Sequence, residues 1–165
     1  MNNVDIFGLQ FTLSLLVFGL LAAWYVNPWL KKHAFADALF LLTLPHAFRY
    51  LGMVFLVPGV VSPSMPSGFA VAAGYGDLAA GVLAILALVA IRQRWAAMIP
   101  LVWLFNIVGV LDLVNALSHI EAVPHFQSAW YIPTFLVPVL LVTHFMMFAR
   151  LLRPAETLAG AQSHL

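Results

Sequence analysis

The sequence predicts an all-α integral membrane protein, a bundle of five transmembrane helices with the N-terminus outside and the C-terminus in the cytoplasm. Only 8% of the 165 residues are charged and 64% are hydrophobic. Ordinary soluble domains have about 25% charged and about 45–50% apolar residues. A soluble protein of this composition would leave large apolar patches uncovered. The apolar residues also form stretches of about 20, the length that a helix needs to cross a bilayer.

Five stretches meet this length requirement. We expect one transmembrane domain over residues 1–153 and a polar cytoplasmic tail over residues 154–165. The first stretch is not interpreted as a cleaved signal peptide, because the residues before it carry one acidic side chain and no basic one. The spans are expected at about 6–26, 35–57, 69–91, 96–118 and 129–149.

The orientation follows from the rule that cytoplasmic loops are enriched in Lys and Arg. The loops 58–68 and 119–128 contain no Lys or Arg. We therefore expect both loops to lie outside a plasma membrane, which is the inner membrane if the source is bacterial, with the lipid bilayer as a partner. Six of the seven basic residues lie in the other inter-span segments or after the last span: Lys31, Lys32, Arg92, Arg94, Arg150 and Arg153.

Composition also excludes several function classes. The sequence has no cysteine, which excludes disulfides and thiolate metal sites. A net charge of +1 provides no basic surface for nucleic acid. Lys31 and Lys32 lie in a loop, so no retinal Schiff base is expected. No ligand spacing such as HxxxH is present, and we predict no metal site.

Three charged residues, Arg49, Asp77 and Asp112, lie inside predicted spans. Each costs about 2.5–3.5 kcal/mol at the bilayer centre on insertion scales, so such residues face the bundle interior and find partners there. Counted along ideal helices, all three lie about 9–12 Å below the outer surface. We therefore expect Arg49 to pair with one or both aspartates. If both aspartates are ionised the three charges sum to −1, which calls for a proton or a bound cation.

Further polar residues surround these three on a helical wheel. In the second span, Thr43, His46, Arg49, Tyr50 and Met53 are predicted to share one face, beside a kink at Pro45. In the fourth span, Asn115 and His119 follow Asp112 on one face, whereas Asn106 points elsewhere. The predicted ligand-binding residues are His46, Arg49, Tyr50, Asp77, Asp112 and Asn115.

The favoured hypothesis is a transporter-like or receptor-like protein that binds a small molecule or protons in the outer half of the bilayer. The alternative is a redox protein that binds b-type haem or quinone through His46 and Arg49, with His144 as a second haem ligand that lies about 6 Å deeper by helix rise. A membrane enzyme and an accessory subunit of a larger complex are further alternatives, and the oligomeric state stays open. The three buried charges also have a purely structural interpretation, an ion-pair network that fixes the helix register.

Overall fold

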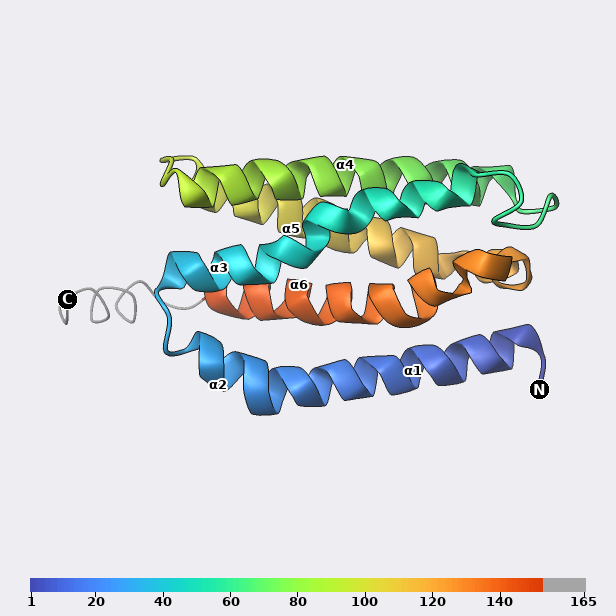
Figure 1. Ribbon diagram of the computed structural model, residues 1–165, viewed down its shortest axis with the longest axis horizontal. Helices are drawn as coiled ribbons and strands as arrows, with labels where there is room; N and C mark the ends of the chain where they lie inside the picture. The colour runs from blue at the N-terminus through green and yellow to red at the C-terminus, as the bar shows by residue number, and fades with distance from the viewer. Residues whose placement is uncertain (153–165) are drawn as a thin grey trace.

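The computed structural model describes residues 1–152, and the predicted tail over 154–165 lies outside the described residues. Within that part, the chain forms the five long apolar helices that the composition predicts, each long enough to cross a membrane. Their bounds are Asn3–Leu30, Phe35–Leu56, Ser67–Arg92, Met98–Ser118 and Gln127–Leu151. The helices run up and down between two ends of an elongated bundle (Figure 1).

The first long helix consists of α1 (Asn3–Leu21), the π-helical turn η1 (Ala22–Val26) and α2 (Asn27–Leu30). Its start is fixed by a capping box, because Asn2 and Asp5 each bond the other's backbone N–H, at 2.8 and 3.0 Å. The π turn ends two residues before Pro28, whose ring removes a helix donor. α1 packs mainly on the last helix and is the most exposed of the five (Figure 1).

The second long helix changes its geometry in the middle. α3 (Phe35–Thr43) is followed by η2 (Leu44–Leu56), which is a 3₁₀ helix over its whole length. Runs of more than 3–4 residues are uncommon for this conformation. Pro45 at the start of η2 cannot donate to the preceding turn, so the predicted change at Pro45 occurs as a switch of helix type.

The centre of the bundle is the contact between η2 and α4 (Ser67–Arg92), the most extensive contact between any two elements. α4 presents small residues to η2, and a Cβ on Gly81 would lie 3.3 Å from the backbone nitrogen of Tyr50. Such residues let two helix backbones approach closely. α5 (Met98–Ser118) also packs on α4.

The last long helix completes the bundle. Three short elements lead into α6 (Val137–Leu151): the 3₁₀ turns η3 (Ile120–His125) and η4 (Gln127–Trp130), and the π turn η5 (Ile132–Leu136). The π turn η5 includes Pro133. α6 lies between α1 and the group formed by α3, η2, α4 and α5 (Figure 1).

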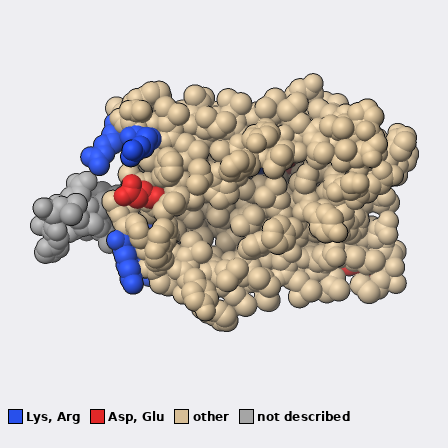
Figure 2. Space-filling model, in the orientation of Figure 1, with Lys and Arg blue, Asp and Glu red and all other residues tan. Residues whose placement is uncertain are grey.

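Charged side chains are distributed unevenly along the bundle. Figure 2 shows Lys and Arg side chains gathered at one end of the molecule, opposite the end that carries the N-terminus in Figure 1. We call the two ends of the bundle the basic end and the N-terminal end. The basic end carries Lys31, Lys32, Arg92 and Arg94. Near the basic end an apolar cluster fills the interior, built around Leu39, Leu42, Val102, Phe105 and Met147. Near the N-terminal end a second cluster contains Phe7, Phe55, Phe69 and Phe126.

Candidate functional site

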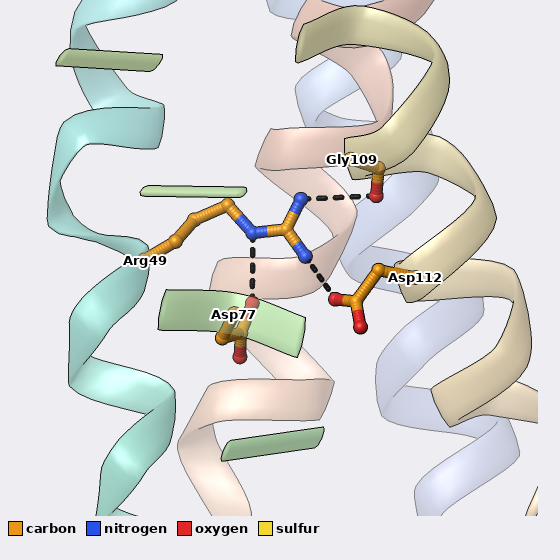
Figure 3. Close-up of polar contacts among 4 residues, drawn as sticks. All are labelled: Arg49, Asp77, Gly109 and Asp112. Atoms are coloured by element: carbon orange, nitrogen blue, oxygen red, sulfur yellow. Dashed lines mark hydrogen bonds and ion pairs between the residues drawn. The ribbon is translucent and has the colours of Figure 1, made fainter. Parts of the chain in front are cut away.

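Arg49 lies at the centre of the bundle and binds three groups on two neighbouring helices. Its Nε donates to Asp77 Oδ1 at 2.7 Å, one terminal nitrogen donates to Asp112 Oδ2 at 2.5 Å, and the other donates to the carbonyl of Gly109 at 2.9 Å. Figure 3 shows the guanidinium reaching from η2 to Asp77 on α4 and to Gly109 and Asp112 on α5. The prediction that Arg49 pairs with one or both aspartates is confirmed, and it pairs with both.

The 3₁₀ geometry of η2 decides which side chains join Arg49. In a 3₁₀ helix, residues three apart lie directly above one another. The row that faces the interior is therefore Thr43, His46, Arg49, Gly52 and Phe55, all of which are buried. Tyr50, predicted as a site residue from α-helical periodicity, is instead 47% exposed, and Met53 is 37% exposed. The predicted stripe was thus wrong for these two residues, because the period is three residues rather than 3.6.

Three glycines make room for the charged side chains. A Cβ on Gly52 would overlap the carboxylate of Asp77, and a Cβ on Gly76 would overlap that of Asp112. A Cβ on Gly109 would lie 2.6 Å from a carbon of the His144 ring and 2.9 Å from Arg49. Any larger residue at these positions would force the charged groups apart.

The two aspartates differ from Arg49 in their exposure. The Arg49 side chain has no exposed surface, whereas 12% of the Asp77 side chain and 13% of the Asp112 side chain are exposed. One oxygen of each carboxylate, Asp77 Oδ2 and Asp112 Oδ1, receives no hydrogen bond from any residue that the structure describes. If both carboxylates are ionised, the group of three carries a net charge of −1.

A cavity leads from these carboxylates toward the N-terminal end. Its volume is about 30 Å³, which is room for one or two water molecules, and its wall is mostly apolar. Asp77 and Asp112 line its inner part, and His119, whose side chain is 34% exposed, lines it near the surface. Arg49 is not part of the wall, so the cavity presents hydrogen-bond acceptors and not their counter-cation. Four phenylalanines also line it: Phe7, Phe55, Phe69 and Phe126.

The mouth of the cavity carries a hydrogen bond between a histidine and a carboxylate. His119 Nδ1 lies 2.7 Å from Glu121 Oε1. This hydrogen bond lowers the pKa of Glu121 below its ordinary value. Asn115, the remaining predicted site residue, is exposed and does not line the cavity.

A second polar group lies on the other side of Arg49. The rings of His46 and His144 are in contact, with centroids 4.0 Å apart, and neither residue has exposed surface. The expected difference in depth between the two histidines was wrong. A 3₁₀ helix rises about 2.0 Å per residue instead of 1.5 Å, which moves His46 about 5 Å farther from the N-terminal end over the ten residues up to Leu56.

Hydrogen bonds fix the protonation of both rings. His144 Nδ1 lies 2.6 Å from Asn106 Oδ1, while the Asn106 amide nitrogen donates to the His144 carbonyl at 3.4 Å, so the ring nitrogen is the donor. His46 Nε2 lies 2.9 Å from Thr143 Oγ1, whose hydroxyl donates to backbone carbonyls of α6. His46 Nδ1 and His144 Nε2 are buried without a hydrogen-bond partner. Because a buried N–H without a partner is costly, both rings are neutral and these two nitrogens are bare acceptors.

Haem and quinone do not fit this arrangement. Bis-histidine ligation needs a porphyrin between the two rings, but the rings of His46 and His144 touch each other. A quinone carbonyl needs an available donor, but Arg49 does not line the cavity and binds Asp77, Asp112 and Gly109. A haem site would require His46, Arg49 and His144 to be neighbours, and they are. The contact between the two rings leaves no space for haem.

Sequence reasoning missed Asn106, Gly109 and Thr143. Asn106 was expected to point away from the site, but it has no exposed surface and binds His144. Asn106, three residues before Gly109 and six before Asp112, is on the same helix as both. This spacing is the one signal in the sequence that relates Asn106 to the site. Nothing in the sequence identifies Thr143 as the partner of His46, because that contact joins residues 97 positions apart.

Comparisons with known proteins place the chain in a family. No curated protein and no solved structure matches it. One family model matches residues 6–152, which include every helix that forms the site. Since the match extends over most of the chain, the protein belongs to that family, which is described as a domain of unknown function (DUF8737).

Proposed function

We propose that this protein is a multi-pass membrane protein whose cavity binds a small, mainly apolar molecule that carries a cationic group. The observation that carries the proposal is the make-up of the cavity. Its only charged wall residues among those described are Asp77 and Asp112, while their counter-cation Arg49 is hidden behind them. A ligand that enters by separating the apolar side chains around this small space therefore meets two carboxylates at its inner end.

The orientation follows from the positions of the basic residues. Four of them lie in the connections at the basic end, and the rule for cytoplasmic loops assigns this end to the cytoplasm. The N-terminal end then faces outside, in the plasma membrane, and so does the mouth of the cavity. The ligand is expected to enter from outside, past His119.

The cavity wall suits an organic cation. Phe7, Phe55, Phe69 and Phe126 supply aromatic rings to the wall. An aromatic face attracts a cation by about 0.5–2 kcal/mol, with the larger value for a desolvated site. The carboxylates at the inner end add a charged partner for the same group. An anion of equal size would find no cation in the wall to pair with, because Arg49 does not line the cavity.

The interior between the site and the basic end is closed. Leu39, Leu42, Val102 and Phe105 belong to an apolar cluster that fills this part of the bundle. A closed inner half fits either a receptor that binds from outside or a transporter in a state that is closed toward the cytoplasm. Both belong to the transporter-like or receptor-like class, and uptake into proteoliposomes separates them.

The test is binding of three probes of similar size to the purified protein in lipid nanodiscs, measured by calorimetry against empty nanodiscs. Benzylamine and benzyltrimethylammonium are cations, and benzoate is an anion. We expect the two cations to bind and benzoate not to bind. Asp112→Asn is expected to weaken cation binding at least about tenfold, the equivalent of one lost interaction of about 1.4 kcal/mol.

The matched control is Asp37→Asn, which removes an exposed carboxylate outside the cavity. This variant is expected to bind the cations as the wild type does. Equal binding of benzoate and benzylamine, or unchanged binding by Asp112→Asn, would contradict the proposed function.

A further inference from the structure

The buried charges around Asp112 do not balance. We consider every charged or titratable group that faces the two carboxylates from the elements packed around them. The only formal cation among them is Arg49, and its guanidinium serves both carboxylates. The groups come from four elements: Arg49 and His46 from η2, Asp77 from α4, Asp112 from α5 and His144 from α6. His119, which directly follows α5, lies at the mouth of the cavity.

The histidines do not supply the missing positive charge. His46 and His144 each donate one hydrogen bond and keep one bare nitrogen, so both rings are neutral. His144 Nε2 and one terminal nitrogen of Arg49 lie within 2.9 Å of the same point, the position of a Cβ on Gly109. A proton on that ring would therefore lie directly beside the guanidinium. His119 lies at the mouth of the cavity, where its ring is hydrogen-bonded to Glu121.

The missing charge must therefore be balanced on the carboxylates themselves. Two ionised carboxylates with one shared cation would keep a net charge of −1 in a site where Arg49 has no exposed surface. Burying an uncompensated charge is strongly unfavourable. One proton on the pair removes this charge without breaking a contact, because each carboxylate binds Arg49 through one oxygen and keeps the other free.

We infer that the empty site holds one proton, shared by Asp77 and Asp112, and that a cationic ligand binds in exchange for it. This inference rests on the proposed function. In the exchange the O–H bond of the carboxyl group breaks, the proton passes to water in the cavity, and the ligand's positive charge takes its place. No electron is transferred. The proton leaves from Asp112, because this residue is partly exposed whereas Asp77 is buried.

The exchange has a defined signature in the binding equilibrium. Because one proton is released for each cation bound, the apparent dissociation constant rises about tenfold for each unit by which the pH falls, as long as the empty site stays protonated. A permanent cation shows this dependence most clearly, since it has no titratable proton of its own. Benzyltrimethylammonium meets this condition, whereas benzylamine does not.

Two measurements test the exchange on the full-length protein in nanodiscs. Infrared spectroscopy of the ligand-free protein at pH 7 is expected to show the carbonyl band of a protonated carboxyl group, which Asp112→Asn removes or shifts and Asp37→Asn does not. A pH indicator in weak buffer is expected to report about one proton released per bound benzyltrimethylammonium. Asp37→Asn is expected to release the same amount, and Asp112→Asn none.

The outcomes separate this inference from the proposed function. Binding of benzyltrimethylammonium without proton release, or with an affinity independent of pH, overturns the exchange and leaves the proposed function standing. A ligand-free protein without the protonated-carboxyl band also overturns the exchange, whatever binds. If neither cation binds, the proposed function and the exchange fail together.

Discussion

Gly76 of α4 lies directly against Asp112 of α5, so that a methyl group on the glycine would occupy the position of Asp112 Oδ1. The contact is possible only because glycine has no side chain. It fixes the distance between the two helices at the level where Arg49 joins them. The carboxylate therefore has little freedom to move along α4, and the geometry of the cavity's inner end depends on this one position.

Gly76→Ala is therefore expected to displace Asp112 and to weaken cation binding. A forced shift in a packed interior costs typically 1–3 kcal/mol, and we expect a similar loss of unfolding free energy. Calorimetric titration with benzylamine and thermal unfolding in detergent measure the two effects. Gly68→Ala is the control on the same helix, because nothing lies within 4 Å of its added Cβ. Equal behaviour of the two variants would contradict the packing argument.

Arg49→Gln is expected to lower the free energy of unfolding by about 3–5 kcal/mol, the usual effect of removing one partner from a buried ion pair. The variant leaves the carboxyl groups of Asp77 and Asp112 without their cation. Its defect should be smaller when Asp112→Asn is added, since only one carboxylate then lacks a partner. Denaturant unfolding of the two single variants and the double variant measures this coupling. Purely additive losses would show that Arg49 and Asp112 do not act together.

Arg49 and the two aspartates could be predicted from the sequence because charges inside apolar spans are rare and must find one another. The neighbours of Arg49 could not be predicted by the same reasoning. Tyr50 was included, and the depth of His46 was misjudged, because Pro45 starts a 3₁₀ helix whose length no local pattern reveals. Asn106 was excluded because its partner His144 is on another helix, and such contacts depend on how the helices pack.

The hydrogen bonds of the histidine pair predict two different tautomers. His144 should carry its proton on Nδ1, toward Asn106, and His46 should carry its proton on Nε2, toward Thr143. Nitrogen-15 NMR of histidine-labelled protein at pH 7 distinguishes these forms. Asn106→Leu removes the acceptor for His144 and is expected to leave a mixture of tautomers for that ring, with His46 unchanged. Two imidazolium signals from the pair would contradict the neutral assignment.

The hydrogen bond between His119 and Glu121 at the mouth of the cavity predicts the behaviour of Glu121. The hydrogen bond from His119 lowers the pKa of Glu121 in the folded protein. The stabilisation that it provides is therefore present above the ordinary pKa of glutamate and is lost as the pH falls through the lowered value. In His119→Ala the pKa of Glu121 should return toward its ordinary value, as followed by carbon-13 NMR of the carboxyl group. An unchanged pKa would show that the backbone of the loop, and not His119, causes the shift.

The proposed orientation predicts which ends of the helices are accessible from each side of the membrane. Because the sequence contains no cysteine, one introduced cysteine reports a single position. Ser64 and Gln93 are both exposed and lie at opposite ends of α4. A membrane-impermeant maleimide added to intact cells should label Ser64→Cys and not Gln93→Cys, and permeabilised cells should label both. The reverse pattern would place the cavity mouth in the cytoplasm, and the cation would then have to enter from inside.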